Sequence, residues 1–308
     1  MSIKVISGGP LSLVQDLGRF GHQSIGVTTG GPMDEHAFLW ANRLLGNTED
    51  AAQIEVTLGH FSCEFEVNAT VAITGADLGV CINDIPIETW RTHNVNAGDR
   101  LRFTAAKKGL RAYIAVVGGF RTTKMLDSCA TVMRDQLGGL CGKGKKLDVG
   151  DRINCLNSEP RLVTRVPAPF IPDYKEAVVL EVIPSYQYQE FSRKQRQRFF
   201  DSTYTITPQM DRMGCRLSGN SVEFDKSSLI SEGIALGAIQ IPADGQPIVL
   251  LKDRQTIGGY PKIGCLTNKS LNLLAQCTPG TQVQFVEKDI FQAESERVIE
   301  QRFFHHSI

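Results

Sequence analysis

Residues 237–262, GAIQIPADGQPIVLLKDRQTIGGYPK, decide the fold class. Two short apolar runs, Ile239 to Ile241 and Ile248 to Leu251, are separated by a turn of Pro, Asp and Gly and followed by a second glycine-rich turn. Short β-branched runs bounded by turn residues are typical of strands. The stretch therefore predicts two neighbouring strands whose connecting loops carry polar side chains.

Similar runs recur along the whole chain. They are Thr70 to Thr74, Arg100 to Phe103, Ala112 to Val117, Val178 to Ile183 and Thr281 to Val286. Each is bounded by Gly, Pro, Asn or Asp, so the pattern predicts a mainly β protein. Gly98, Gly150 and Gly280 each stand just before a strand-like run, which is compatible with two similar β-barrel halves and also with chance turn chemistry.

Four segments show helical patterns. The clearest begins after Asp34, a good N-cap residue, carries apolar residues on one face and stops at Gly46. The others are Ser192 to Phe200, Lys269 to Cys277 and Asp289 to Arg302. Helices are thus few, and we expect them to pack on β-structure.

The length of 308 residues favours two domains, because single cores stop growing near this size. Four prolines concentrate between Ser158 and Pro172, where they interrupt both helix and sheet. We therefore place the domain boundary there, with an N-terminal domain over residues 1–160 and a C-terminal domain over residues 161–308.

Composition and charge exclude several classes of function. Lys plus Arg and Asp plus Glu both total 33, so there is no net field to attract nucleic acid or an anionic membrane. The start lacks the apolar core of a signal peptide and no stretch could span a bilayer, so a cytoplasmic protein is expected. Eight scattered cysteines, with no C-x-x-C pair and no histidine at zinc-ligand spacing, predict buried reduced thiols and no metal site.

The first polar cluster surrounds the glycine pair Gly30-Gly31 near the N-terminus. Glycine lets backbone N–H groups approach a ligand, and the helix that follows would present a positive dipole end to an anion. The alternative is a tight turn followed by an ordinary helix cap. The candidate substrate-binding residues here are Gln15, Asp16, Arg19, Gly30, Gly31 and Asp34.

The second cluster is Asp211-Arg212 with Arg216 four residues later. The planar fork of arginine suits bidentate binding of carboxylate or phosphate. An Asp–Arg pair that braces a turn is an equally good interpretation.

The third cluster is the densest. Its loops carry acid, amide, guanidinium and phenol groups that a turn does not need, which favours a functional site at strand ends. No P-loop, G-x-S-x-G elbow or H-E-x-x-H helix is present. The candidates are Glu232, Gln240, Asp244, Gln246, Asp253, Arg254, Gln255, Gly258, Gly259 and Tyr260.

These three clusters, in this order and spacing, resemble the family of allophanate hydrolase subunit 2 and the 5-oxoprolinase C subunit, which also includes part of the carboxyltransferase domain of urea carboxylase. The resemblance covers about Val5 to Val286 and implies two cyclophilin-like β-barrel domains. The sequence departs from the family pattern at residues 118–128, at Cys215 and at residues 138–142.

The resemblance implies a component of an ATP-dependent complex that opens 5-oxo-L-proline, a lactam, to L-glutamate. The partners implied are the A and B subunits of 5-oxoprolinase, of which B is subunit-1-like, with ATP used by the complex as a whole. Arg212, Arg216 and Arg254 are candidates for holding carboxylate or phosphoryl oxygens. Asp211 and Asp253 are candidates for orienting those arginines or moving a proton. Asp211, Arg212, Asp253 and Arg254 are the predicted catalytic residues.

Two other functions fit the same residues. One is a carboxyltransferase that acts on urea or a similar amide, with biotin carried by another protein, because this chain has no Met-Lys-Met attachment motif. The other is a regulatory protein that binds a subunit-1-like partner. The neighbouring genes would distinguish the enzymes, since genes for the A and B subunits favour the lactam and a biotin carboxylase favours carboxyl transfer.

Overall fold

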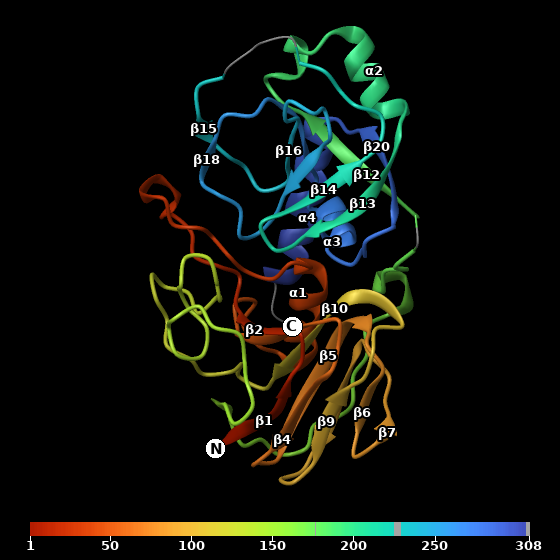
Figure 1. The fold of residues 1–308 in the computed structure, drawn as a ribbon. Coiled ribbons are helices and arrows are strands. Elements are labelled where there is room, and N and C mark those ends of the chain that lie inside the picture. Colours follow the sequence, from red (N-terminus) through yellow and green to blue (C-terminus); the bar gives the residue numbers. More distant parts are fainter. Residues whose placement is uncertain (176, 225–228, 306–308) are drawn as a thin grey trace. The chain divides into compact units, whose positions relative to one another are not determined.

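The computed structural model describes residues 1–175, 177–224 and 229–305. The chain forms two compact units. Unit 1 comprises residues 1–20, 30–174 and 304–308, and unit 2 comprises residues 21–29 and 175–303. Figure 1 colours the chain from its red N-terminus to its blue C-terminus.

The main boundary between the units falls after Tyr174, and not at residue 160 as the prolines suggest. Residues 161–166 run beside β8 (Arg91–Val95) and bond to it and to the preceding turn. Thr164 N donates to Thr92 Oγ1 at 2.8 Å, and Val166 N donates to Trp90 O at 2.9 Å. These bonds place the proline-rich segment in unit 1, because its backbone finds its partners there.

Unit 1 contains two sheets with a shared hydrophobic core. The six-stranded sheet has the order β11-β1-β4-β9-β6-β7 and the five-stranded sheet the order β2-β3-β10-β5-β8. Residues from both, among them Ile3, Phe61, Ile54 and Ile114, are fully buried in one cluster. The strands are β1 (Ser2–Gly8), β2 (Leu11–Gln15), β3 (Gln53–Thr57), β4 (Phe61–Phe65), β5 (Ala69–Asp77), β6 (Val80–Ile82), β7 (Ile85–Pro86), β9 (Arg100–Phe103), β10 (Lys108–Val116) and β11 (Arg152–Asn154).

The helix predicted after Asp34 is confirmed as α1 (Glu35–Leu45). Asp34 Oδ1 accepts a hydrogen bond from Ala37 N at 3.0 Å, and Gly46 ends the helix with φ of 65°. Ala41 packs with Ala72 of the five-stranded sheet. The helix therefore covers one face of that sheet.

Unit 2 is built around a closed barrel with the strand order β12-β19-β16-β17-β14-β13-β20. All of its pairs are antiparallel except β12 with β20. The predicted mainly β class is confirmed, with the closed barrel in unit 2 and two sheets in unit 1. The strands are β12 (Ala177–Pro184), β13 (Thr203–Met210), β14 (Gly214–Ser218), β16 (Ala238–Gln240), β17 (Ile248–Leu250), β19 (Lys262–Leu266) and β20 (Gln282–Glu287).

Two further strands, β15 (Glu232–Gly233) and β18 (Ile257–Gly258), pair with each other outside the barrel. We call this pair the ribbon. Ile234 N donates to Thr256 O at 3.0 Å and extends the pairing by one residue. The ribbon brings the Glu232 and Arg254–Tyr260 parts of the third sequence cluster together.

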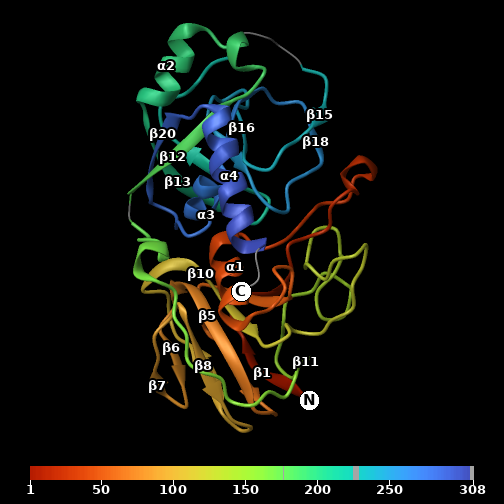
Figure 2. The same cartoon turned by 180° about the vertical axis from the view of Figure 1, so that it is seen from behind.

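The three other predicted helices are present in the second half of the chain. They are α2 (Arg193–Asp201), α3 (Asn268–Leu274) and α4 (Ile290–His305), and Figure 2 shows α4 from behind. Phe199 of α2 stacks on Phe285 of β20, with ring centroids 4.6 Å apart. Short 3₁₀ helices occupy η1 (Gln23–Ile25), η2 (Ala168–Phe170) and η3 (Tyr188–Glu190).

The structure shows the state of the cysteines and the character of the helices. The eight cysteines are free thiols and six of them are buried, as predicted. Within the described residues, no helix is long and apolar enough to cross a membrane.

Candidate functional site

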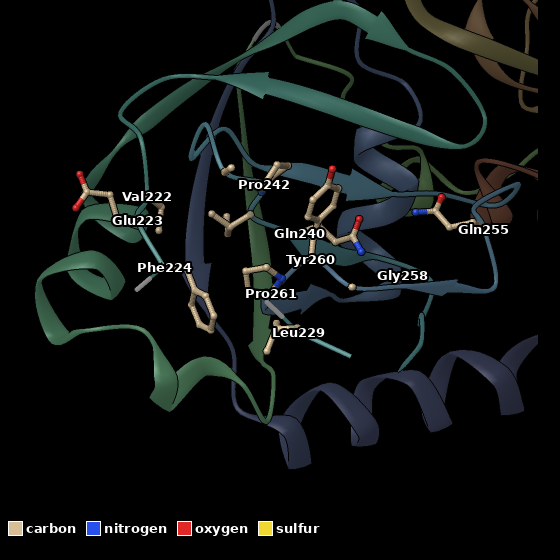
Figure 3. Close-up of a pocket in the computed structure, with 13 residues that line it drawn as sticks. Val222, Glu223, Phe224, Leu229, Gln240, Pro242, Gln255, Gly258, Tyr260 and Pro261 are labelled. Atoms are coloured by element: carbon tan, nitrogen blue, oxygen red, sulfur yellow. The ribbon is translucent and has the colours of Figure 1, made fainter. Parts of the chain in front are cut away.

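Unit 2 contains a pocket of ≈ 610 Å³ between the barrel strand β16, the loop after it and the segment that ends the ribbon. Figure 3 shows its lining. Five residues of the third sequence cluster line it: Gln240, Gln255, Gly258, Gly259 and Tyr260. The remaining lining residues are Val222, Glu223, Phe224, Leu229, Ile241, Pro242, Ala243 and Pro261.

Gln240 is the most buried polar group of this pocket. It is 1% exposed, and its Nε2 atom has no hydrogen-bond partner within the part of the chain that the structure describes. A buried amide N–H without an acceptor costs about 1–3 kcal/mol, so the site favours a ligand that supplies one. A carbonyl oxygen is the simplest acceptor of the right kind.

Gly258 leaves room for a second amide next to the first. A Cβ atom at this position would lie 3.1 Å from Gln240 Nε2, 3.7 Å from Gln255 Nε2 and 2.6 Å from Ile234 Cδ1. Figure 3 shows the two glutamine amides turned toward each other near Gly258. The missing side chain thus keeps a polar space open, and the two amides can offer both donors and an acceptor to a ligand.

Arg254 lies behind this wall of the pocket. Its side chain donates from Nε to Ile234 O at 3.1 Å, and the residue is only 7% exposed. Within residues 1–175, 177–224 and 229–305, no carboxylate pairs with it. Burial lowers the pKa of the guanidinium because it removes water from the charge. A buried cation without a carboxylate is suited to binding an anionic group of a ligand.

Arg212 and Asp253 are engaged with each other. Arg212 Nε donates to Asp253 Oδ2 and Nη2 to Oδ1, both at 2.9 Å, and the side chains are 7% and 6% exposed. Asp253 N also donates to Arg212 O at 2.8 Å. This bidentate pair fixes the loop that begins at Asp253 to the turn between β13 and β14.

Asp211 belongs to the same turn. Its Oδ1 accepts from Met213 N at 2.7 Å and Gly214 N at 3.1 Å, the usual bonding of an Asx turn. The contacts of Asp211, Arg212 and Asp253 therefore match the bracing interpretation of the second cluster.

Arg216, Asp244 and Gln246 hold two other loops together. Arg216 pairs with Asp244, and the Gln246 amide bonds both N and O of Gly219 at 2.8 and 3.2 Å. Val222 N donates to Gly245 O at 2.9 Å. Because Val222 and Ala243 line the pocket, these residues support its rim, while their own side chains do not line it.

Glu232 connects the ribbon to the barrel. Its carboxylate pairs with Lys262 and accepts from Gln187 Nε2 at 3.2 Å and from the Tyr186 hydroxyl. Hydrogen bonds from Lys262 and then Tyr186 hold the pKa of Glu232 below its usual value of 4.5. Sequence reasoning did not single out Lys262, although a lysine at the start of the apolar run Lys262 to Leu266 was a usable signal.

The candidate residues of the first sequence cluster belong to unit 1. Asp16 accepts from Ser128 Oγ at 2.5 Å and Cys129 N at 2.7 Å, while Arg19 donates to Ala130 O at 2.7 Å. Gln15 Nε2 donates to Thr131 O at 3.1 Å. The side chains of Gln15, Asp16 and Arg19 thus all bond the loop of residues 128–131.

The glycines of the same cluster are explained by backbone conformation and close packing. Gly30 and Gly31 both have positive φ, 68° and 97°. A Cβ on Gly31 would lie 2.7 Å from Leu17 O. Asp34 is the cap of α1, and Tyr174 Oη donates to its Oδ2 at 3.1 Å. A close turn and a helix cap account for these contacts.

The comparisons with known proteins agree with this architecture. The family described as "carboxyltransferase domain, subdomain A and B" matches residues 25–287. The chain belongs to this family. The carboxyltransferase-domain chain is 36% identical to the 5-oxoprolinase C subunit of Haemophilus influenzae over 273 residues, which cover 88% of this chain and 86% of that protein. It is 34% identical to the 5-oxoprolinase C subunit of Escherichia coli over 98% of this chain and 96% of that protein.

A solved structure shows the same fold in a longer protein. The K. lactis urea amidolyase superposes with a TM-score of 0.91 at 25% identity. The match covers 98% of the carboxyltransferase-domain chain and 20% of the amidolyase chain. The present chain thus spans about a fifth of that protein, and the family predicted from the three clusters is confirmed.

Proposed function

We propose that this chain is one component of an ATP-dependent 5-oxoprolinase complex that hydrolyses 5-oxo-L-proline to L-glutamate. We also propose that the pocket of unit 2 binds the lactam. The observation that carries the proposal is the share of each relative's length that this chain covers. The chain corresponds to 96% of one 5-oxoprolinase C subunit at 34% identity, and to 20% of the urea amidolyase.

The chemistry of the pocket supports an amide ligand that carries a negative charge. Gln240 Nε2 can donate to a lactam carbonyl, and the Gln255 amide can accept from a lactam N–H. Arg254, buried beside them without a carboxylate partner in the described residues, can hold an oxyanion. Such an oxyanion is present in the carboxylate of 5-oxo-L-proline and absent from urea.

ATP is the second substrate of the proposed reaction. Among the described residues that line the pocket there is no lysine and no arginine, so the lining itself offers no row of cations for a triphosphate, and Arg254 behind it can serve a single carboxylate. The nucleotide would therefore be bound outside this pocket. We propose the A and B subunits of 5-oxoprolinase as the partners, with activity only in their complex, because the names of the two bacterial relatives describe one subunit of several.

The test is reconstitution of the complex. The chain is coexpressed with the A and B subunits, and glutamate release from 5-oxo-L-proline is measured with and without ATP. We expect ATP-dependent release, and a rise of about tenfold or more in KM for Gln240→Leu, which removes the donor from the pocket. Gln282→Leu is the matched control, since Gln282 bonds Thr205 on the outside of the barrel. A purified wild-type complex that releases no glutamate would contradict the proposal.

One observation favours a second function. The family is named for carboxyl transfer, and the urea amidolyase structure shares the fold. The alternative is a carboxyltransferase component that uses biotin carried by another protein to act on urea or a similar amide. Avidin distinguishes the two, because it would block a reaction that depends on biotin and leave lactam hydrolysis unchanged.

A further inference from the structure

Lys262 is a buried cation directly beside the pocket. Its side chain is 7% exposed, and it follows the lining residues Tyr260 and Pro261. In the barrel, Lys262 of β19 is the ladder partner of Gln240 of β16. Opposite residues of an antiparallel pair project on the same side of the sheet, so the ammonium and the Gln240 amide share one face of the barrel.

The ammonium is committed to the ribbon. It pairs with the carboxylate of Glu232, the first residue of β15, and its other acceptor is Tyr260 O at 3.4 Å. Gln187 reinforces the pair from both sides, because its Nε2 donates to Glu232 and its Oε1 accepts from Lys262 N at 2.7 Å. A charge removed from water is stabilising only when it is bonded in this way.

The ribbon carries this restraint to the pocket wall. In its register Glu232 is opposite Gly258, the residue whose missing side chain leaves space between the two amides. A second restraint acts two residues after Glu232, where Ile234 O accepts a hydrogen bond from Arg254 Nε. The position of Gly258 relative to Gln240 therefore depends on how firmly Glu232 is held.

We propose that Lys262 is a positioning residue, which acts through Glu232 and the ribbon to hold Gly258 and Gln255 against Gln240. The proposal deepens the lactam site described above and rests on it for the substrate, but the restraint itself is a property of this chain. Without the ion pair the ribbon moves away from the barrel more often. The two amides are then less often at the spacing that the ligand needs, so the ligand binds more weakly. The chemical step in the bound complex is unchanged.

Two readouts test the proposal on the variants Lys262→Met and Glu232→Gln. In the full chain, amide hydrogen exchange should accelerate at residues 232–234 and 257–258 and stay slow in the barrel strands. In the reconstituted complex, KM for 5-oxo-L-proline should rise about tenfold with kcat within about twofold of wild type. Lys288→Met is the matched control, since Lys288 pairs with Glu181 and Glu296, outside the ribbon.

The outcomes are distinguishable. Unchanged exchange at the ribbon in both variants overturns the proposal, and so does a uniform acceleration over the whole barrel, which marks a general loss of stability. Lys262→Arg, which retains the charge, should restore slow exchange at the ribbon. If Lys262→Met does not fold, Glu232→Gln removes the same pair from its half-exposed end. A wild-type complex without lactamase activity would contradict the proposed function and leave the exchange result standing.

Discussion

At the scale of single residues, the space in front of Gln240 stays open because Gly258 has no side chain. Gly258 has no positive φ, so its backbone would accept any residue. The constraint is the surrounding side chains, which a Cβ would meet at 2.6 and 3.1 Å. Glycine is therefore favoured here for reasons of packing, not of conformation, because any larger residue must displace the ends of the Ile234 and Gln240 side chains.

Gly258→Ala should consequently damage binding more than folding. The added methyl collides with Ile234 and displaces the Gln240 amide, at a cost of about 1–3 kcal/mol. We expect KM for the lactam to rise about tenfold or more in the reconstituted complex. Gly233→Ala, in the other strand of the ribbon, is the control, because its Cβ would meet nothing within 4 Å. Equal KM values for the two variants would show that the space near Gly258 is not used by the substrate.

Arg212 and Arg216 should differ strongly in their effect on stability. Removing one partner of a buried ion pair costs about 3–5 kcal/mol, whereas a partly exposed pair contributes about 1 kcal/mol or less. Arg212→Met removes the guanidinium that bonds both carboxylate oxygens of the buried Asp253, while Asp244 beside Arg216 is 51% exposed. Urea unfolding followed by circular dichroism measures both.

Tryptophan fluorescence provides an internal reference for this comparison. Trp40 and Trp90 are the two tryptophans of the chain, and both lie in unit 1. Arg212→Met should therefore shift the circular dichroism transition and leave the fluorescence transition in place. A shift of similar size for Arg216→Met would contradict the assignment of stability to burial.

At this scale, sequence patterns predict relations between residues that are close in the chain and miss contacts between residues that are far apart in it. Gln240, Gln255 and Gly258, three candidates of the third cluster, all line the pocket, because they lie within one short stretch of the chain. The pairing of Arg212 with Asp253 spans 41 residues and no local pattern contains it. Lys262 was passed over for the same reason, since its partner Glu232 stands 30 residues earlier.

At the scale of elements, the ribbon links the local chemistry to the barrel. Strands β15 and β18 have two residues each, too short for any period-two pattern to reveal. Several longer strands and the four α-helices were predicted within a few residues, because burial of one face sets their periodicity. Closure of the barrel was implied by resemblance alone, since the order of strands depends on contacts distant in sequence.

The ribbon should loosen in acid. Lys262 and Tyr186 face Glu232 and lower its pKa below 4.5, so the charged form is favoured in the folded state. A depressed carboxyl pKa contributes stability above the unfolded value, and this contribution is lost as the pH falls through the folded value. By calorimetry, wild type should melt above Glu232→Gln at pH 7, and the difference should stay constant to about pH 5 and shrink below 4.5. A difference independent of pH would contradict this assignment.

At the scale of the whole molecule, the chain passes between its two units more than once. Residues 21–29 belong to unit 2, where Gln23 Nε2 donates to Ile234 O at 2.9 Å and Thr28 Oγ1 donates to Arg254 O at 3.2 Å. No sequence pattern predicted that residues 21–29 belong to unit 2. Composition and proline content indicate where a chain is extended, but not which unit it packs with. A small segment near the N-terminus thus completes the C-terminal unit.

A break in the main connection should therefore not separate the units. If a specific protease site is inserted after the exposed Lys175 and cut, the N-terminal fragment still contributes residues 21–29 to unit 2. We expect the two fragments to elute together in gel filtration and to separate only in denaturant. The double variant Gln23→Leu/Thr28→Val removes two side-chain hydrogen bonds of this segment, so it should weaken the association of the two fragments. Immediate separation of the wild-type fragments would contradict the division of the chain.

The same segment has a consequence for biosynthesis. Thr28 is translated 226 residues before Arg254, its partner in the loop behind the pocket. At a synthesis rate of about 5–20 residues per second, this interval lasts roughly 10–45 s. The pocket wall cannot be completed during that time, and residues 21–29 must wait outside the ribosome without their partners. A chaperone that binds this early stretch would thus keep it available until Arg254 has been made.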